Sequence, residues 1–458
     1  MLSNLTPEKI EELIGIQGYV ARGRGIGGVI KLKPEDFLTW EILTDGSNAK
    51  EAYESWDGLS KGIGDFILAI MRKRRIDTIR AVTLIAKKLG VKPRTISICG
   101  IKDKMSISWQ FITIPSSPTL SNELRIDETI HVLPLRYTSH KLTSKDLAKN
   151  AFEITIRKTS GKHEEAIQII QELKSRGLPN YYGHQRFGIT RPITPIIGRL
   201  IMEEKLEEAV ITFLTAYSPL ESSKNREARE KLSNDFDPAK ALEYYPKTLR
   251  YERMMLNYLA RKPNDYQGAL RSLPLRLRRL MIESVSALIF NKTLSKIISS
   301  NLLNELELGD LVIKLDIFGR PEPGRPIEVI RGNIDQIERL VKQGKFGIIL
   351  PVPGYLSPIP KSRKGELLLK TMKELKIDLK MFRLKTLPEA STRGSLRPII
   401  VSKWDCRPIG MADSSLKLSI RLPPGSYATI LLREIMKPEN PLAFIGKTVN
   451  SDGVNVSG

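Results

Sequence analysis

Two short segments hold the residues best suited to chemistry, and the first centres on an aspartate. Residues 100–104 read GIKDK, so Asp103 stands between Lys102 and Lys104. Nearby positive charges favour the ionised form of a carboxyl group, and we expect these lysines to keep Asp103 ionised. A positioned carboxylate can act as a nucleophile or as a base. An aspartate taken alone is more often a helix cap or an ion-pair partner, so its basic surroundings are what favour catalysis.

The second segment combines aromatic rings with polar side chains on a predicted loop. Residues 180–188 read NYYGHQRFG, in which at least one of the three rings belongs in the core. Asn180, Gln185 and Arg186 lie between the rings and offer hydrogen bonds to a base edge and a contact to a phosphate. Enzymes that act on a base extrude it and stack it against such rings, and stacking contributes about 1–3 kcal/mol per base. The two segments together predict an enzyme that acts on RNA or DNA through one aspartate.

The charge balance supports a polyanionic partner. The chain of 458 residues has 73 Lys and Arg against 51 Asp and Glu, a net charge of +22 and a pI of about 9.8. The excess is uneven, because residues 61–104 carry twelve basic and three acidic side chains while residues 1–60 carry six and ten. Clustered positive charge is the electrostatic footprint of nucleic-acid binding. The length predicts two to four domains.

Other features favour a cytoplasmic protein. Two cysteines, Cys99 and Cys406, do not make a disulfide framework and suit a reducing compartment. The first residues lack the pattern of a signal peptide, and no apolar run approaches the roughly 18 residues that would cross a bilayer. We therefore expect no membrane partner.

Several motifs are weaker than they look. Residues 23–28 match G-x-G-x-x-G, but a strand-like segment ending in proline follows where a dinucleotide site needs a helix. Glu35, Asp36 and Glu41 could supply ligands for a hard metal ion, although a surface turn is the more ordinary interpretation. The histidines and cysteines show no zinc spacing, and no nucleophile elbow or P-loop occurs. Two rivals to a base-modifying enzyme remain, namely a non-catalytic RNA-binding module and a metal-dependent nuclease that uses these three acids.

The spacing of apolar residues predicts an α+β fold with mainly antiparallel pairing. Asp77 and Gly90 mark the start and stop of one amphipathic helix. We expect helices at residues 61–75, 78–89, 164–176 and 428–436, and strands at residues 29–33, 37–43, 95–101, 106–114, 152–157 and 417–422.

The composition and the predicted secondary structure of the chain change near residue 189. Residues 196–300 are mostly helical by periodicity and rich in basic side chains, and strands punctuated by Gly and Pro follow from about residue 309. Arg276, Arg278 and Arg279 crowd one short stretch of this region. We expect these arginines to bind phosphates, with an affinity that falls steeply as salt rises.

Five segments together resemble the TruD family of tRNA pseudouridine synthases in its long archaeal form. Residues 100–104, followed by Gln110, resemble the family's G-x-K-D catalytic segment, and residues 180–188 resemble its N-[YF]-[FY]-G-x-Q-R-F-G signature. Residues 31–41 resemble its N-terminal P-x-D-F-x-V-x-E motif, and residues 394–398 and 425–429 resemble its C-terminal segments. The matches lie in order across nearly the whole chain.

The resemblance implies a fold, a domain division and a reaction. It implies a pseudouridine synthase catalytic domain, with a mixed and mainly antiparallel sheet flanked by helices, at residues 1–188 and 394–458. The family's own α+β insertion domain, which binds RNA, would occupy residues 189–393. The family acts on uridine 13 of tRNA, and some members act also on position 35, without a metal or an organic cofactor. At residues 285–287 the sequence VSA replaces the family's more usual YQS.

The resemblance also implies roles for particular residues. Asp103 maps onto the catalytic aspartate, and Tyr182 maps onto the aromatic residue that stacks on the target uracil. Phe37, Lys102 and Asn180 map onto positions that line the same pocket, where Lys102 would keep Asp103 charged and oriented. Asp103 would attack the sugar carbon, attack the base or remove the ribose 2′ proton, and the sequence leaves these three paths open.

Overall fold

The structure is a computed structural model that describes residues 5–116, 120, 122–450 and 453–456. Its largest element is a ten-stranded sheet with the order β15-β16-β8-β2-β5-β3-β7-β6, in which β1 also pairs with β8 and β4 with β5. Antiparallel pairing predominates, while β2 and β5 run parallel. The strands are β1 (Gly27–Val29), β2 (Phe37–Leu43), β3 (Phe66–Arg74), β4 (Ser97–Ile98), β5 (Ile107–Pro115), β6 (Leu124–Ile126), β7 (Ile130–Thr138), β8 (Leu147–Thr159), β15 (Asp405–Ala412) and β16 (Ser415–Leu422). The predicted α+β class is confirmed.

Helices pack on this sheet where the sequence carries apolar stripes. The helix predicted between Asp77 and Gly90 is confirmed as α3, with the Asp77 side chain accepting from the backbone of Arg80 and Gly90 in the left-handed conformation. The other helices near the sheet are α1 (Lys9–Leu13), α2 (Ala49–Glu54), α4 (His163–Arg176) and α14 (Ala428–Met436), beside α3 (Thr78–Leu89).

The helix predicted over residues 61–75 is wrong, because its central part is strand β3. This strand lies between β5 and β7 and pairs with both along its length. Its run of apolar residues is buried on both faces, which removes the alternation that would have marked a strand. The strand expected at residues 29–33 is also wrong, because β1 covers Gly27–Val29 and shares only Val29 with the predicted range. Strand β1 ends at Val29, and two residues later the backbone turns left-handed at Lys31, with φ of 62°.

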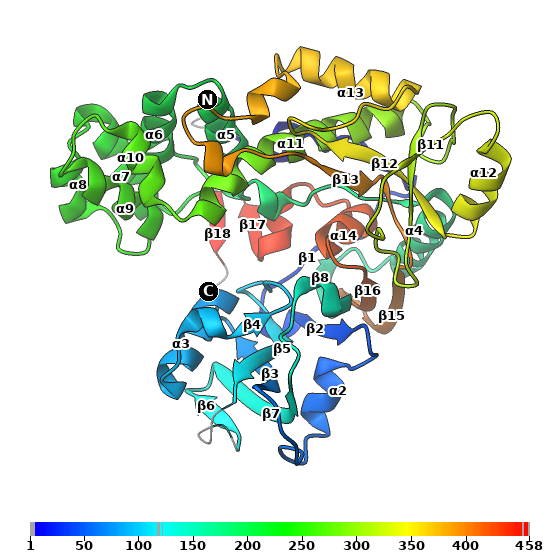
Figure 1. Cartoon of the computed structure of the whole chain (residues 1–458), viewed down its shortest axis with the longest axis horizontal. Helices are drawn as coiled ribbons and strands as arrows, with labels where there is room; N and C mark the ends of the chain where they lie inside the picture. The colour runs from blue at the N-terminus through cyan, green and yellow to red at the C-terminus, as the bar shows by residue number, and fades with distance from the viewer. Residues whose placement is uncertain (1–4, 117–119, 121, 451–452, 457–458) are drawn as a thin grey trace.

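A second group of elements follows residue 193. A four-stranded sheet has the order β11-β10-β12-β13, and two short pairs join β14 to β9 and β17 to β18. Figure 1 shows a helical lobe of α6 to α10 at the upper left and this smaller sheet at the upper right, above the lobe of β2 to β7. The elements are α5 (Thr194–Met202), α6 (Leu206–Thr215), α7 (Ser223–Asp235), α8 (Pro238–Tyr244), α9 (Arg250–Leu259), α10 (Tyr266–Ser272), α11 (Leu275–Ser299), α12 (Ile334–Lys342), α13 (Arg363–Glu374), β9 (Leu178–Pro179), β10 (Leu311–Lys314), β11 (Ile327–Glu328), β12 (Phe346–Val352), β13 (Ser395–Pro398), β14 (Ile400–Val401), β17 (Lys447–Asn450) and β18 (Gly453–Val456).

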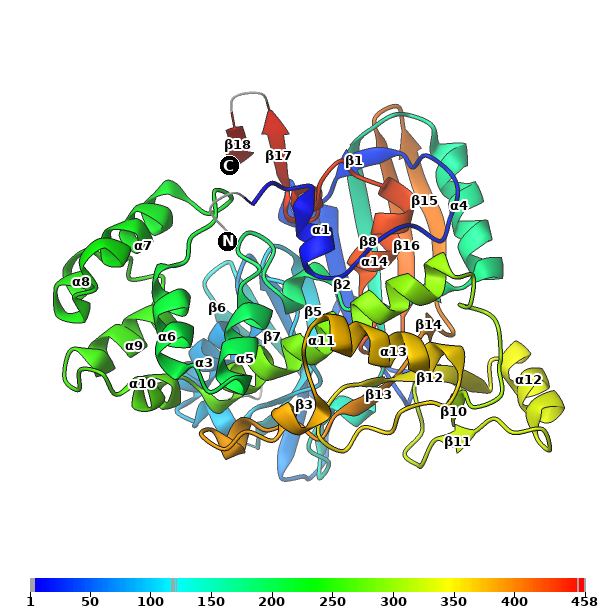
Figure 2. The same cartoon turned by 90° about the horizontal axis from the view of Figure 1, so that it is seen from above.

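Helix α11 joins the two large hydrophobic cores. Ala287 and Phe290 on this helix belong to the core beneath the ten-stranded sheet, whereas Val285 and Ile289 belong to the core of the helical lobe. Figure 2 shows α11 running across the middle of the molecule between these parts. Ser286 is also buried and donates to the carbonyl of Pro353 at 2.6 Å. The departure from the family pattern at residues 285–287 therefore lies in packed positions.

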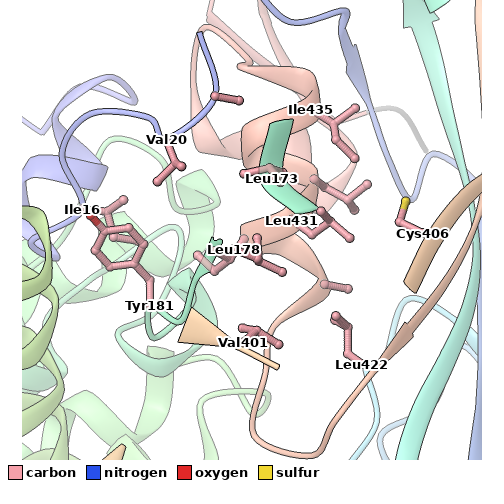
Figure 3. Close-up of a cluster of buried hydrophobic side chains, with 14 of the residues drawn as sticks. Ile16, Val20, Leu173, Leu178, Tyr181, Val401, Cys406, Leu422, Leu431 and Ile435 are labelled. Carbon is pink, nitrogen blue, oxygen red and sulfur yellow. The ribbon is translucent and has the colours of Figure 1, made fainter. Parts of the chain in front are cut away.

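The loop that begins at Asn180 is anchored by the larger core. Strand β9 pairs with β14 immediately before the loop, and Figure 3 shows Leu178 and Val401 beside Leu431 of α14. The first tyrosine of the loop, Tyr181, is buried and its hydroxyl lies 2.9 Å from Ser295 Oγ on α11. This confirms that one ring of the aromatic segment is core, and it fixes the position from which the next residues project.

Candidate active site around Asp103

The segment that carries Asp103 has little regular structure, so buried polar side chains satisfy its backbone. Gln110 on β5 donates to the Gly100 carbonyl at 2.8 Å, and the Thr78 hydroxyl accepts from the Lys102 amide at 3.0 Å. Thr78 in turn donates to Gln110 at 2.9 Å. A buried backbone group without a partner is costly, and these contacts hold the segment in one conformation.

Two further donors converge on the main-chain carbonyl of Asp103. The ammonium group of Lys73 on β3 donates to it at 2.7 Å and to the Ile76 carbonyl at 2.9 Å, and Ser106 Oγ donates to it at 2.8 Å. Lys73 is fully buried, and this burial lowers the pKa of its side chain to about 8. The backbone of Asp103 is therefore held in one position, with the Lys73 ammonium group against its carbonyl.

The carboxylate of Asp103 contacts one partner through each oxygen. Oδ2 accepts from Lys31 Nζ at 2.8 Å, and Oδ1 accepts from Gln185 Nε2 at 2.7 Å. Burial alone would raise the pKa of Asp103, but the charge of Lys31 and the two hydrogen bonds outweigh it, so the pKa lies below its usual value. The side chain is 24% exposed. The low pKa keeps Asp103 ionised, and its carboxylate remains partly open to solvent.

Lys31 has the contact that the sequence had suggested for Lys102. Its side chain is 2% exposed, and its ammonium group lies 4.3 Å from the centre of the Phe37 ring. Phe37 is itself 3% exposed. The predicted pocket residue Phe37 therefore lies against Lys31, where its ring supports the cation.

The expectation that Lys102 pairs with Asp103 is wrong. Lys102 Nζ lies 2.6 Å from Glu41 Oε1, and the other carboxylate oxygen of Glu41 accepts from the Phe111 amide at 2.9 Å. Both side chains of the pair are buried, and Lys104 is exposed. Neighbouring side chains along an extended segment project to opposite sides, so adjacency in sequence placed Lys102 away from the Asp103 carboxylate.

Tyr182 is the ring of the second segment that remains partly open. Its backbone amide donates to Asn291 Oδ1 at 2.9 Å, and its carbonyl accepts from Asn291 Nδ2 at 3.0 Å. The ring meets Phe290 and Tyr427 edge-on, with centroid separations of 5.7 and 6.3 Å. The Arg397 guanidinium lies 4.2 Å from the ring centre, so three side chains hold the Tyr182 ring at one angle.

Asn180 holds Arg397, which differs from the base-reading role expected for it. Asn180 is 7% exposed, its Oδ1 accepts from Arg397 at 2.6 Å, and its Nδ2 donates to the Pro398 carbonyl at 2.9 Å. Arg397 also donates to the Gly425 carbonyl at 2.9 Å. Burial lowers the pKa of Arg397 below its usual value. With its amide engaged by protein groups, Asn180 acts on the site through Arg397 and Tyr182.

Gln185 and Arg186 connect the two segments to each other and to α11. Gln185 is exposed and reaches Asp103, while the Arg186 guanidinium lies 5.7 Å from the centre of the Tyr182 ring. Arg186 also donates to Glu283 Oε2 on α11 at 2.7 Å. The loop therefore contacts Asp103 through Gln185 and the Tyr182 ring through Arg186.

The three arginines of α11 do not form one exposed group. Arg276 and Arg279 are exposed, and Arg279 donates to the Glu389 carbonyl at 3.1 Å. Arg278 is 9% exposed and its guanidinium pairs with the Glu389 carboxylate. The expectation that Arg278 offers its charge to RNA is wrong, because an acid of the same chain already neutralises it.

The three acids that could have formed a metal site are separated by their partners. Glu35 pairs with Arg74 at 2.7 Å, Asp36 pairs with Arg157 at 2.7 Å, and Glu41 pairs with Lys102. Among the residues that the structure describes, no three His, Cys, Asp or Glu side chains gather as metal ligands.

Sequence reasoning missed three residues of the site: Lys31, Lys73 and Arg397. Each lies within or next to a stretch that was examined, but its partner lies far along the chain, as 72 residues separate Lys31 from Asp103. The available signal for Lys31 and Arg397 was their position inside the motifs at residues 31–41 and 394–398. Lys73 carried the weaker signal of a charged residue within a strongly apolar run.

The chain matches a known protein family over most of its length. Residues 13–435 match the family model described as tRNA pseudouridine synthase D (TruD). The chain belongs to the TruD family. TruD enzymes are isomerases that convert uridine to pseudouridine in tRNA, so the predicted class of enzyme and of substrate is confirmed.

Relatives match this TruD chain along most of its length. A protein of Methanosarcina acetivorans named "Probable tRNA pseudouridine synthase D" is 31% identical over 440 residues, which cover 94% of this chain and 97% of the relative. A protein of Pyrobaculum islandicum with the same name is 31% identical over 431 residues, with coverage of 94% and 97%. The crystal structure of TruD from Methanosarcina mazei superposes with a TM-score of 0.76 at 29% identity, covering 95% of this chain and 99% of that one. Within the described part of this TruD chain, no helix is both long enough and apolar enough to cross a membrane.

Proposed function

We propose that this TruD enzyme isomerises uridine 13 of tRNA, with position 35 as the second candidate, and that Asp103 starts the reaction. The observation that carries the proposal is the placement of the Asp103 carboxylate between Lys31 and Gln185 of the loop that presents Tyr182. An acid kept ionised at the open edge of a site, beside a partly exposed ring, suits an extruded nucleoside.

In the proposed reaction, the bond from uracil N1 to ribose C1′ breaks and a bond from uracil C5 to the same carbon forms. The C5 proton is lost and N1 gains one, so the product is an isomer and the balance needs no redox partner. Asp103 acts as nucleophile toward the sugar or the base, or as base toward the 2′ proton, and these three paths remain alternatives. Tyr182 stacks on the detached uracil while it turns, and retaining the base in place is a positioning effect.

The protein supplies the electrostatic conditions for this step. Lys31 keeps Asp103 ionised before substrate binds. Gln185 is exposed and therefore free to release the carboxylate when a nucleoside enters. Arg397 fixes the plane of the Tyr182 ring from behind. Lys102 is assigned no direct part, since its charge is paired with Glu41.

The first test replaces the proposed catalytic acid by its neutral isostere. Asp103→Asn is expected to lower the single-turnover rate on a tRNA transcript by at least about 10³-fold, because an amide lacks the charge for nucleophilic or base catalysis. Pseudouridine is mapped by carbodiimide treatment and primer extension, which also locates the modified position, and incubations with and without magnesium are compared. Conversion by Asp103→Asn at the parent rate would refute the assignment. Strand scission would indicate the nuclease, and intact, unmodified RNA with the parent protein would indicate the non-catalytic binder.

We also propose that residues 1–188 and 394–458 form the catalytic domain and that residues 189–393 form the insertion domain that holds tRNA. Arg276 and Arg279 are its exposed candidates on α11. The double variant Arg276→Ala/Arg279→Ala is expected to weaken tRNA binding several-fold and to reduce the slope of log affinity against log salt by up to about 2. The single-turnover rate at saturating enzyme should stay unchanged, and the matched Lys/Lys variant should keep the salt slope. A loss of rate with affinity intact would contradict this role.

A further inference from the structure

A hollow of about 670 Å³ lies beside the strand segment that leads to Lys31. Its lining comes from the glycine-rich residues 24–29, from residues 158–160 at the end of β8, from residues 437–440 after α14, and from Ala443 and Lys447. We call it the glycine pocket. The glycine-rich motif does not open a helix, since β1 follows it, so a dinucleotide site does not account for it.

Positive charge dominates the glycine pocket. Arg24 and Lys158 are exposed, Lys447 is half-buried, and none of the three has an ion-pair partner among the described residues. Lys437 is engaged differently, because its ammonium group donates to the carbonyls of Ala21 and Gly23. The acid in the lining is Glu439, which is exposed. The lining thus holds three cations without an ion-pair partner among the described residues, and one carboxylate.

Lys447 is the informative member of this set. Burial lowers the pKa of its side chain, and no acid among the described residues opposes that effect. A partly desolvated cation without a counter-ion is unfavourable in the free protein, and an anion bound in the pocket would relieve the cost. Among the buried lysines, Lys31, Lys102 and Lys364 have carboxylate partners, and Lys73 donates to two backbone carbonyls.

The pocket is directly connected to the candidate active site. Val29 lines it, and Lys31, which holds the Asp103 carboxylate, follows two residues later. Two residues of chain span at most about 7 Å. The Ile30 amide donates to the Ala443 carbonyl at 3.0 Å, and a side chain added at Gly446 would come within 2.5 Å of the Lys31 carbonyl. Figure 2 shows β17, which begins at Lys447, standing near β1.

We propose that the glycine pocket binds a backbone phosphodiester of tRNA close to the target nucleotide, through Lys447, Lys158 and Arg24. The proposal rests on the assignment of the reaction to Asp103. Lysine and arginine bind phosphate oxygens by charge-assisted hydrogen bonds, and glycines allow a backbone to approach a ligand closely. Gly27 has a positive φ of 63°, and a Cβ built on it would meet no described atom within 4 Å, so the backbone there borders open space. A phosphate fixed here would anchor the strand from which the nucleoside is extruded.

The first experiment measures tRNA affinity at a series of salt concentrations with Asp103→Asn as the parent, so that no turnover occurs. Adding Lys158→Gln and Lys447→Gln is expected to weaken binding about tenfold near 150 mM salt and to reduce the salt slope by about 2. The matched Lys158→Arg/Lys447→Arg variant keeps both charges and should restore the slope. Thermal unfolding of each variant shows that it is folded. An unchanged affinity and slope in the Gln/Gln variant would overturn the proposal.

The second experiment locates the phosphate. Neutral methylphosphonate linkages are placed one at a time around the target uridine of a tRNA substrate. One linkage is expected to weaken binding to the parent and to have no further effect on the Gln/Gln variant, which is the signature of a direct contact. If every methylphosphonate linkage instead weakens binding to the Gln/Gln variant as much as it weakens binding to the parent, the proposal is overturned. A variant that loses affinity for inorganic phosphate but binds tRNA as the parent does would also overturn it.

These outcomes are separable from those of the proposed function. Binding is measured without chemistry, so the pocket can fail while Asp103→Asn still abolishes conversion in the otherwise native enzyme. If Asp103→Asn instead retains conversion, the assignment of the reaction to Asp103 fails, and the linkage experiment still shows whether a phosphate sits in the pocket.

Discussion

Two consecutive residues, Lys102 and Asp103, each form a lysine–carboxylate pair, and the two pairs differ in how far the carboxylate is exposed to solvent. The Lys102–Glu41 pair is sealed, with side-chain exposures of 7% and 0%, and the second Glu41 oxygen accepts from a backbone amide. The Lys31–Asp103 pair has a buried lysine but an aspartate that is 24% exposed, and its second oxygen accepts from the exposed side chain of Gln185. The Glu41 carboxylate is enclosed by protein, while the Asp103 carboxylate keeps an edge that is open to solvent.

The difference indicates how one segment can combine rigidity with reactivity. A buried pair with good geometry holds its elements in place, since losing one partner leaves an uncompensated charge. In the open pair, Lys31–Asp103, the same attraction keeps Asp103 ionised. Lys102 therefore anchors the segment to β2, and the adjacent Asp103 is presented on that anchor.

The sealed pair should respond to mutation through stability. Lys102→Met is expected to lower the free energy of unfolding by about 3–5 kcal/mol, because Glu41 would be left buried without a counter-ion. The double variant Lys102→Met/Glu41→Gln should recover a large part of the loss. Unfolding in urea measures both. If Lys102→Met instead unfolds like the native protein but has lost its single-turnover rate, then Lys102 acts on the reaction and the comparison between the pairs fails.

The open pair should respond through chemistry. Lys31→Gln is expected to lower the single-turnover rate about a hundredfold at neutral pH, since burial would then raise the pKa of Asp103 against only the Gln185 hydrogen bond and the charge of Lys73. The sign predicts partial recovery as pH rises, because more Asp103 becomes ionised above its raised pKa. Lys31→Arg keeps the charge and serves as the control. A pH-independent loss in Lys31→Gln would show that Lys31 contributes something other than ionisation of Asp103.

A smaller effect should come from the cation beneath the open pair. Burial lowers the pKa of Lys73 from its usual 10.5 to about 8, so the ammonium group loses its proton as pH rises through that value. The positive charge that favours ionised Asp103 is then lost, and the rate should fall about threefold between pH 7 and 9. Single-turnover rates at saturating enzyme, measured across this pH range, report the fall. If the rate of Lys73→Met falls in the same way between pH 7 and 9, the fall belongs to another titrating group.

Much of the site could be predicted from local sequence. Asp103 and the loop at residues 180–188 were found because their residue types are uncommon together, and the structure joins them through Gln185. Helix α3 and strand β2 followed from capping residues and apolar spacing. In each case the signal is short-range, since a cap or an amphipathic period is complete within a few residues.

Only the tertiary structure determined which lysine forms an ion pair with which carboxylate. Adjacent residues point different ways, so Lys102 reaches Glu41 while Lys31, 72 positions from Asp103, supplies the counter-ion of Asp103. The left-handed backbone at Lys31 is not required by its residue type and arises where β1 ends. Strand β3 was mistaken for a helix because burial on both faces erases its period. Pairings of this kind depend on long-range packing, which no local pattern of residues records.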